Sequence, residues 1–483
     1  MQSRQSVRMF PPVLRRLSFA LATVVATATL AGCTGAHQAS GPTAGSQAPT
    51  SVDDGAEATD FPPAPSVPTG AIAPAVNAAV ERLVPSLQID SVDAAAVDTI
   101  ARSGDARLAW ILSDVMRFTG GTDHEKLGRA FTTLTGAKVD GGDDDIWTQS
   151  TDLLILWDTP APPDYLRFKS SLFLALEPRW GKIFNDRKAD IDWRFLSWGG
   201  VLPDDRGLGE DRRCVRGCIP ALDDPALTSA ADGSWYPDND LVFAVTVGDE
   251  SVAFPKNIME VHEMVNTTIG GRRIGMPYCT LCGSVQAFFT DRVPGVRAPL
   301  VLRTSGLLSL SNKVMYDPDS GSAFDTFAGR AVSGPLHDAK VTLPMLTTVV
   351  SRWGDWRRAH PDTRIVARDG GIGEEYPVDP LEGRDDNGPI FPIRRSDGRL
   401  GVHTQVLGVV AADGVSVAFP VDTVRKALDK GTVVRAHDIT LKPDGGGLRA
   451  FVDGKEVPTH QSFWFAWAQF HPGTELWGAT ASG

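Results

Sequence analysis

The chain has 483 residues, of which 42% are hydrophobic and 22% are charged, and its formal net charge is −12. This length and apolar content are enough for two or three hydrophobic cores. An acidic chain without a basic patch is a poor partner for nucleic acid or for an anionic membrane face, and we expect neither as an electrostatic partner. Only five cysteines are present, so each can be considered by itself.

The N-terminus has the plan of an export signal. Four arginines precede an apolar run over residues 17–30, which small residues follow. The run is too short for a membrane span, which needs about 20 apolar residues. Residues 30–33 read Leu-Ala-Gly-Cys and resemble the lipobox of bacterial lipoproteins. The resemblance implies a signal peptide over residues 1–32 and a lipid on Cys33. An ordinary signal peptide is the alternative, and the general and twin-arginine export routes both stay open.

A tether is predicted to follow the signal. Residues 33–72 are mostly Ala, Gly, Ser, Thr, Pro and Gln. Such a segment buries too little surface to offset the entropy lost on ordering, so we expect it to be flexible. The folded part would then be extracytoplasmic, with the membrane surface as its partner through the lipid on Cys33.

Residues 73–192 are predicted to form a small helical domain. Apolar residues in the segment "ARLAWILSDVMRF" recur at the spacing of one helix face. They are Leu108, Ile111, Leu112, Val115 and Met116.

From residue 193 to residue 483 the chain carries short β-type runs separated by Gly, Pro and Asp turns. The segment "MYDPDSGSAFD" (315–325) is typical of a hairpin with an Asp-Pro-Asp-Ser-Gly turn. The predicted fold class is therefore α+β, with a helical domain followed by a mainly β domain.

An internal duplication is predicted in the β domain. "VFAVTVGDESVAFP" (242–255) is echoed by "VLGVVAADGVSVAFP" (406–420), and W-x-x-x-H-P-x-T occurs at 356–363 and at 467–474. The echoes come in the same order, which favours two related β-β-helix units, at about 242–366 and 406–477. His360 and His471 belong to the repeated element and precede a proline, so we expect them to cap or pack a helix.

The segment "MEVHEMVNTTIGGRRIGMPYCTLCGSVQAFF" (259–289) has no counterpart in the second unit. If residues 257–265 form one helix, His262 faces an apolar arc that includes Met264 and Val265, while Glu260 and Glu263 point away from it. His262 and the Cys-x-x-Cys are additions peculiar to the first unit, which favours a functional site over a shared structural role.

Three interpretations of this segment compete. His262, Cys279 and Cys282 suit copper or zinc, and three protein ligands leave one coordination position open. Alternatively, Cys279 and Cys282 form a dithiol/disulfide couple whose thiolate a nearby imidazolium stabilises. The third interpretation is a plain disulfide in an oxidising compartment.

Cys214 and Cys218 are candidates for a local disulfide. The rival is a four-cysteine structural zinc site with Cys279 and Cys282. The sequence contains no G-x-S-x-G and no Walker or Rossmann glycine loop, and no histidine stands beside a cysteine as in a Rieske centre. The type of reaction, and whether there is one, stays open.

Three segments together resemble the exported bacterial and archaeal domain-of-unknown-function family numbered 3179. They are "HEMVNTTIGGRRIGMPYCTLCGSVQAFF", "LRTSGLLSLSNKVMYDPDSGSAFDTFAGRAVSGPL" and "WGDWRRAHPDT", and the likeness runs from roughly residue 192 to 477. Threonine and leucine stand between the cysteines, where many relatives have proline and leucine. The resemblance implies an exported domain and no stated activity. It carries the family pattern onto His262, Cys279, Cys282, Gly283 and Gly306, and onto a candidate pocket of Glu263, Ser284, Arg303, Ser305, Tyr316 and Asp317.

The sequence thus predicts a lipid-anchored extracytoplasmic protein with a copper or zinc site, with or without redox activity. Two other functions stay open. One is a cell-envelope binding or scaffold protein whose two cysteine pairs are structural disulfides, and the other is a thiol–disulfide oxidoreductase.

Overall fold

The structure is a computed structural model that describes residues 61–478, except 88–90, 211–213, 215–216, 384–388, 390–392 and 394–396. The predicted signal peptide, Cys33 and most of the predicted tether lie outside the described residues. Within the described ranges, no helix has both the length and the apolar character needed to cross a membrane.

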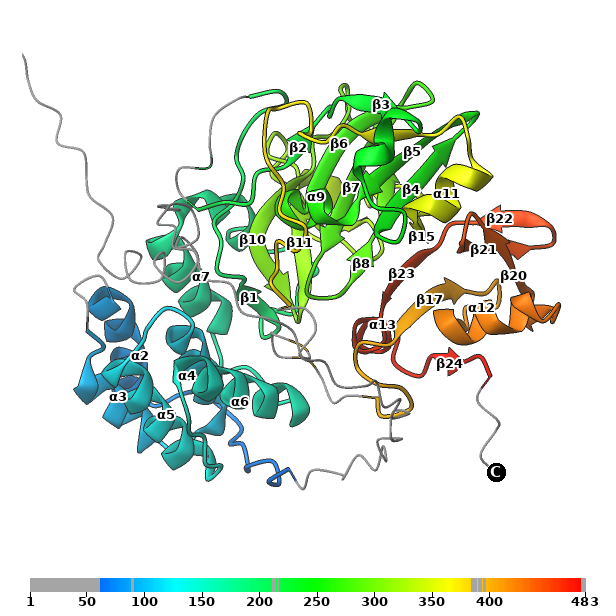
Figure 1. Ribbon diagram of the computed structural model, residues 1–483. Helices are drawn as coiled ribbons and strands as arrows, with labels where there is room; N and C mark the ends of the chain where they lie inside the picture. The colour runs from blue at the N-terminus through cyan, green and yellow to red at the C-terminus, as the bar shows by residue number, and fades with distance from the viewer. Residues whose placement is uncertain are drawn as a thin grey trace, which may run out of the picture.

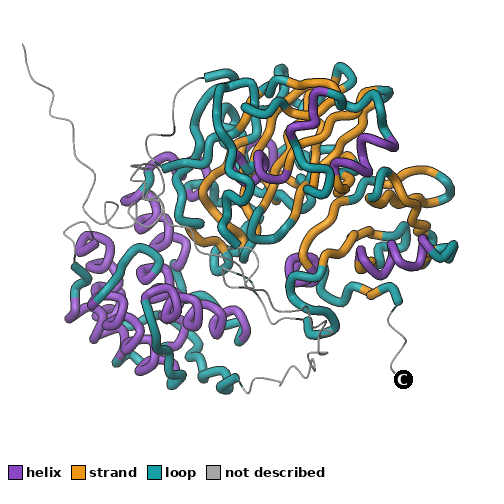
Figure 2. Tube along the Cα trace, in the orientation of Figure 1, coloured by secondary structure: helices purple, strands orange, loops and turns teal. Residues whose placement is uncertain are grey.

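Most of the helices gather at one end of the molecule, and strands and loops with a few short helices make up the rest (Figure 2). The apolar spacing over residues 108–116 falls on a helix, as predicted, and Asp93 caps the preceding helix by accepting a hydrogen bond from the Ala96 amide. Its helices are α2 (Pro74–Leu87), α3 (Ala94–Ala101), α4 (Ala109–Met116), α5 (Thr122–Thr135), α6 (Asp143–Leu156), α7 (Tyr165–Leu176) and α8 (Gly181–Phe184), with short 3-10 turns at Ala106–Leu108 and Pro178–Trp180.

The hydrophobic core of the helical part continues into the β part. Phe195, Leu196 and Trp198 are buried among the helices, together with Leu307 and Leu310. The ring of Trp198 stacks on Phe118 and its backbone belongs to a strand, so the helices cover one sheet and bury its apolar face.

The β part contains five sheets in the described residues. The first sheet has the order β1-β10-β11-β12-β13 and the second has β14-β9-β7-β6-β2, with β8 paired to β7. The strands of the first are β1 (Leu196–Trp198), β10 (Arg303–Ser309), β11 (Asn312–Tyr316), β12 (Ala323–Asp325) and β13 (Arg330–Ala331). The strands of the second are β2 (Leu222–Asp223), β6 (Met264–Ile269), β7 (Arg272–Cys279), β8 (Ser284–Val285), β9 (Ala287–Phe289) and β14 (Met345–Leu346).

The other three sheets include the sequence echoes. Their orders are β15-β4-β5-β16-β3, β23-β17-β18-β24 and β19-β20-β21-β22. The strands are β3 (Leu227–Ser229), β4 (Leu241–Val247), β5 (Glu250–Pro255), β15 (Val349–Arg352), β16 (Arg364–Val366), β17 (Gln405–Val410), β18 (Ser416–Pro420), β19 (Val434–Ala436), β20 (Ile439–Asp444), β21 (Gly447–Val452), β22 (Lys455–Val457), β23 (His460–Phe463) and β24 (Glu475–Leu476). The helices of the β part are α9 (Lys256–His262), α10 (Pro335–Asp338), α11 (Trp353–Ala359), α12 (Val421–Asp429) and α13 (Trp464–Phe470), with a 3-10 turn at Asp232–Trp235.

The broad prediction of a helical part followed by a mainly β part is confirmed. The predicted hairpin at 315–325 is also present, because β11 pairs antiparallel with β12 and places Met315 opposite Phe324.

Two segments of the β part have the same topology, and we call them the first unit (residues 241–366) and the second unit (residues 405–476). In the first, the hairpin β4–β5 is flanked by β15, antiparallel to β4, and by β16, parallel to β5. In the second, the hairpin β17–β18 is flanked by β23, antiparallel to β17, and by β24, parallel to β18. Figure 1 shows the two units side by side. The shared topology agrees with the sequence echoes, and an origin by duplication stays a prediction.

The repeated W-x-x-x-H-P-x-T motif forms the same contacts in both units. Trp356 stacks on His360 and Trp467 stacks on His471, each pair with ring centroids 3.8 Å apart. Both histidines are the C-cap residues of their helices, α11 and α13. Their predicted role in capping and packing is therefore confirmed.

The threonine of the motif ties the helix to the sheet. The Trp356 indole N–H donates to Thr363 Oγ1 at 3.0 Å, and the Trp467 indole N–H donates to Thr474 Oγ1 at 2.9 Å. Each hydroxyl donates in turn to a backbone carbonyl of the neighbouring strand, at 3.2 Å in the first unit and 3.0 Å in the second.

The helix that carries His262 ends earlier than the sequence predicts. Glu263 has a left-handed backbone (φ 51°), and β6 starts directly after it. The prediction that Met264 and Val265 share a helix face with His262 is wrong. A short apolar run can be buried by a helix or by a strand, and here its pairing with β7 decides for the strand.

Replacing the motif threonine by valine should destabilise either unit. Thr363→Val and Thr474→Val keep the side-chain shape but leave a buried indole N–H without its acceptor, which costs about 1–3 kcal/mol of unfolding free energy. Denaturant unfolding of each variant measures this loss. Thr133→Val, at an exposed helix position, is the control, and an effect as small as the control's in both motif variants would contradict the role of the hydroxyl.

Candidate functional site

The Cys-x-x-Cys forms a tight turn between two strands. Strand β7 ends at Cys279, and β8 folds back on it with Ser284 opposite Cys279. The Cys282 amide donates to the Cys279 carbonyl oxygen at 3.2 Å, and Gly283 has a left-handed backbone (φ 53°). This turn brings the two thiols within hydrogen-bonding range of each other.

Both thiols are free and enclosed. Cys279 is 2% exposed and Cys282 is fully buried. The carbonyl oxygen of Ser311 lies 3.8 Å from the Cys279 sulfur and 3.4 Å from the Cys282 sulfur. The surrounding apolar cluster comes mostly from the second unit and includes Phe327, Val406, Ala418, Trp464, Phe465 and Trp467.

The two thiols have pKa values shifted in opposite directions. Burial raises the pKa of Cys279, but the hydrogen bond from Cys282 and the positive charge and backbone N–H of Lys313 outweigh it, so that its pKa is lowered. Burial raises the pKa of Cys282 well above its ordinary value, and the neighbouring Cys279 raises it further. Cys279 is therefore the thiol that ionises first, with Cys282 as its hydrogen-bond donor.

A buried ion pair stands beside the dithiol. Lys313 is 4% exposed, donates to the Glu263 carbonyl oxygen at 2.9 Å and pairs with the Glu263 carboxylate. The Thr280 hydroxyl donates to the same carboxylate at 3.1 Å. The prediction that Glu263 points away from the interior is wrong, because the helix on which that prediction rests ends here and the carboxylate pairs with the buried Lys313. Glu260, also predicted to point away from the apolar arc, is buried and paired with Lys256.

His262 faces the interior, as predicted, and is 1% exposed. Its Nδ1–H donates to the Pro220 carbonyl oxygen at 2.8 Å, and its Nε2 accepts a hydrogen bond from the Tyr376 hydroxyl at 2.7 Å. Burial lowers the pKa of His262 and so favours the neutral ring. Both ring nitrogens are occupied, and a metal ion at Nε2 would have to displace Tyr376.

The structure brings together the two cysteines but not the predicted trio with His262. Among the described residues, one group of three histidine, cysteine or acidic side chains has ligand atoms within 4.8 Å of one another, and it consists of Asp204, Cys214 and Cys218. His262 is instead the chain neighbour of Glu263, whose carboxylate pairs with Lys313, and the charge of Lys313 acts on Cys279. A three-ligand metal site does not fit this arrangement.

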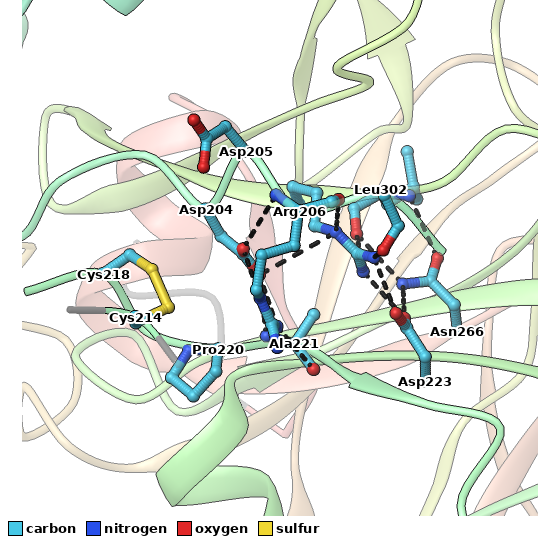
Figure 3. A network of polar contacts seen from close by, with 12 residues as sticks. Asp204, Asp205, Arg206, Cys214, Cys218, Pro220, Ala221, Asp223, Asn266 and Leu302 are labelled. Carbon is cyan, nitrogen blue, oxygen red and sulfur yellow. Dashed lines mark hydrogen bonds and ion pairs between the residues drawn. A yellow bond between two sulfur atoms is a disulfide. The ribbon is translucent and has the colours of Figure 1, made fainter. Parts of the chain in front are cut away.

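Cys214 and Cys218, the predicted disulfide pair, are joined by a disulfide, with Cα atoms 5.2 Å apart (Figure 3). The nearby Asp204 carboxylate accepts hydrogen bonds from Arg206 and from the Ala221 amide. Sulfurs bonded to each other are no thiolate ligands, so the four-cysteine zinc arrangement does not fit either.

A buried arginine holds the backbone at Arg206 and Gly207, which precede this disulfide in the chain. Arg303 is fully buried, and its guanidinium donates to both oxygens of Asp223, at 2.7 and 2.6 Å. It also donates to the carbonyl oxygens of Arg206 and Gly207. Figure 3 shows the Asp223 carboxylate turned toward Asn266, which donates to it at 3.0 Å. The guanidinium thus joins β10 to Arg206, Gly207 and β2. Pro220, whose carbonyl oxygen accepts from His262, lies just before β2 in the chain.

Three of the other predicted pocket residues form hydrogen bonds with the backbone. The Tyr316 hydroxyl donates to the Asp204 carbonyl oxygen at 2.8 Å, and the Ser305 hydroxyl donates to the Val314 carbonyl oxygen. Asp317 accepts hydrogen bonds from two backbone amides. Ser284 differs, because its hydroxyl is buried without a hydrogen-bond partner in the described residues.

Sequence analysis missed Ser311 and Lys313. Both come to the dithiol from the β10–β11 hairpin, and no spacing in the chain relates them to the cysteines. Lysine in the apolar segment "NKVMY" is the one signal that could have indicated a buried charge.

The family model described as "Protein of unknown function (DUF3179)" matches residues 216–441, so the chain carries a domain of this family, as its motifs predict. The match contains His262, the Cys-x-x-Cys, Lys313 and the start of the second unit. No curated protein and no solved structure matches the chain.

Removing the buried guanidinium should destabilise the β part strongly. Arg303→Met leaves the Asp223 carboxylate without its counter-charge, and breaking such a pair costs about 3–5 kcal/mol. Arg357→Met, which breaks an exposed pair with Asp238, should cost at most about 1 kcal/mol. Denaturant unfolding of both variants measures the difference, and equal losses would contradict the role given to Arg303.

Proposed function

We propose that Cys279 and Cys282 form a redox-active dithiol and that the protein performs thiol–disulfide exchange as an exported, lipid-anchored protein. The observation that carries the proposal is a pair of free thiols with opposed pKa shifts beside the Lys313 cation. Such an asymmetry is what an attacking and a resolving cysteine need. The location and the lipid on Cys33 are supported by the leader sequence alone.

The exchange uses one substrate disulfide and both thiols. The Cys279 thiolate attacks one substrate sulfur, which forms a mixed disulfide and releases the other substrate sulfur as a thiolate. Cys282 loses its proton to that thiolate and attacks the Cys279 sulfur, releasing the second substrate thiol. The substrate disulfide is reduced to two thiols, and the protein is oxidised to the Cys279–Cys282 disulfide. A dithiol reductant returns the protein to its reduced form by the reverse exchange.

Lys313 supports the first step. Its charge and backbone N–H stabilise a thiolate on Cys279 at lower pH than an ordinary thiol allows. The Ser311 carbonyl oxygen accepts from the thiol form of Cys282 and so favours a proton on that sulfur. The Glu263 carboxylate neutralises Lys313 in the resting protein, which keeps the enclosed charge balanced.

Cu(I) binding by the same two sulfurs is the second candidate. It is favoured by two soft thiols in a dry apolar cluster, a combination that suits Cu(I). It does not use His262. Zinc is less well supported, because it prefers four ligands and the described residues offer two sulfurs here.

A redox titration of the full protein tests the proposal. We expect a two-electron couple at 279–282 with a midpoint of about −120 to about −270 mV, the range of dithiol oxidoreductases. Thiol trapping and mass spectrometry of that segment give the oxidised fraction, and Cys279→Ser should abolish the couple. A midpoint below about −300 mV would mark a structural disulfide and refute the exchange function. One equivalent of copper retained by the reduced protein against a thiol competitor would favour the second candidate.

Removing the lysine charge should raise the pKa of Cys279. Below that pKa the midpoint potential falls by about 59 mV per pH unit, because two protons accompany two electrons, and above it by about 30 mV. In Lys313→Met the break between the two slopes should move to higher pH, whereas Lys313→Arg keeps the charge and should leave it near its wild-type position. The measurement is the midpoint potential between about pH 6 and pH 10. A break that moves equally in both variants would contradict the electrostatic role.

A further inference from the structure

A cleft of about 420 Å³ lies between the first unit and the second unit. Its volume falls in the range of about 300–1,000 Å³ that is typical of small-molecule sites. The residues that line it include Thr246, Leu346 and Thr347 of the first unit and Arg449, Glu456 and Pro458 of the second.

The two walls of the cleft are anchored to each other by contacts between the units. Strand β21 packs against β15 of the first unit (Figure 1). The Ser351 hydroxyl of β15 donates to the Gly445 carbonyl oxygen, in the turn before β21. Nε2 of His360 and the Asp444 carboxylate share a hydrogen bond of 2.7 Å. The second-unit wall is therefore held in place by the first unit.

Strand alternation explains why charged side chains line the second-unit wall. Leu448 and Ala450 of β21 are buried in the apolar core of the second unit. Arg449, between them, lies on the opposite face of the sheet and lines the cleft. Lys442 of β20 lies opposite Arg449 in the antiparallel register and shares its face.

The Arg449 guanidinium is fixed by two carboxylates. Its Nε donates to Asp444 at 2.6 Å and its Nη1 donates to Glu456 at 2.7 Å. The Arg449 side chain is 15% exposed and that of Glu456 is 39% exposed. Within the described part of the chain, Nη2 of Arg449 and the second carboxylate oxygen of Glu456 have no hydrogen-bond partner. A donor and an acceptor thus stand next to each other for a ligand.

The charges on this face of the sheet balance. Asp444 and Glu456 stand against Arg449 and Lys442. A charged ligand would bring a further charge without a counter-charge, whereas a hydroxyl group can donate to a carboxylate and accept from a guanidinium at once. Leu346 and Pro458 add apolar surface to the cleft. A neutral ring with hydroxyls on its edge and C–H groups on its faces matches both kinds of surface.

We infer that the cleft binds a neutral saccharide, with Arg449 and Glu456 as the residues that bond to its hydroxyls. This inference goes beyond the proposed function and is independent of it, because neither Cys279 nor Cys282 is among the residues that line the cleft. The protein then combines a dithiol with a carbohydrate-binding site between its two units.

Titration calorimetry of the full-length protein at about pH 6 tests the inference. The neutral probes are maltose, cellobiose and N,N′-diacetylchitobiose, and the charged probes are the cationic chitobiose and the anionic digalacturonate. We expect at least one neutral probe to bind saturably, with a dissociation constant of about 1 mM or lower and at least about tenfold below that of either charged probe. Absence of saturable binding for all three neutral probes, or equally tight binding of a charged one, would overturn the inference.

Variants on the two walls locate the binding site. Glu456→Ala should raise the dissociation constant of the tightest neutral probe by about tenfold, because a hydrogen bond to a charged group is lost. Thr246→Phe, which narrows the cleft from the first unit, should weaken binding as well. Glu475→Ala is the matched control, since this exposed carboxylate of the second unit pairs with His437 and does not line the cleft.

Urea unfolding of each variant checks that it is folded. The Glu475→Ala protein should bind the probe as tightly as the wild-type protein. A folded Glu456→Ala protein with an unchanged dissociation constant would mean that the saccharide binds elsewhere on the protein, and it would overturn the inference.

Discussion

The placement of His262 beside Pro220 depends on one buried guanidinium. Arg303 has no exposed surface, and its charge is balanced by Asp223 on β2, while its other donors reach backbone carbonyls in the loop that precedes this strand. That loop ends at Pro220, whose carbonyl oxygen fixes the His262 ring. A charge in a dry interior needs partners of this kind, so the arginine holds the backbone at Arg206 and Gly207 close to β2. The position and the tautomer of the histidine follow from it.

The dithiol is positioned by a different part of the chain. The cysteines occupy the turn from β7 to β8, Lys313 and Ser311 come from the neighbouring hairpin, and the apolar cover comes mostly from the second unit. Three segments that are distant in the sequence thus supply the two thiols, the positive charge of Lys313 and the apolar cover that excludes water. Because each segment is held by its own sheet, the low-pKa thiolate is a property of the assembled β part and not of the Cys-x-x-Cys turn alone.

Sequence patterns predicted the features that depend on local periodicity or repetition. The helical part, the hairpin at 315–325, the inward histidine and the helix-capping roles of His360 and His471 are all of this kind. The end of α9 at His262 could not be predicted, because a short apolar run fits a helix and a strand equally well. Lys313 was missed because only strand pairing brings it to Cys279. A metal site shared by His262, Cys279 and Cys282 was predicted from their closeness in the sequence. In the structure, both ring nitrogens of His262 form hydrogen bonds with Tyr376 and Pro220 instead.

Gly283 links the shape of the turn to the packing of the units. Its left-handed backbone favours glycine, and a β-carbon there would lie 2.8 Å from the Phe463 ring. Gly283 therefore allows the chain to reverse direction next to the sulfurs, and it also allows the second unit to pack against them. A methyl group at this point would strain the Cys-x-x-Cys turn and would also push the Phe463 ring of the second unit away from it. A side chain at this position is therefore opposed on two grounds, the left-handed backbone and the nearness of the Phe463 ring.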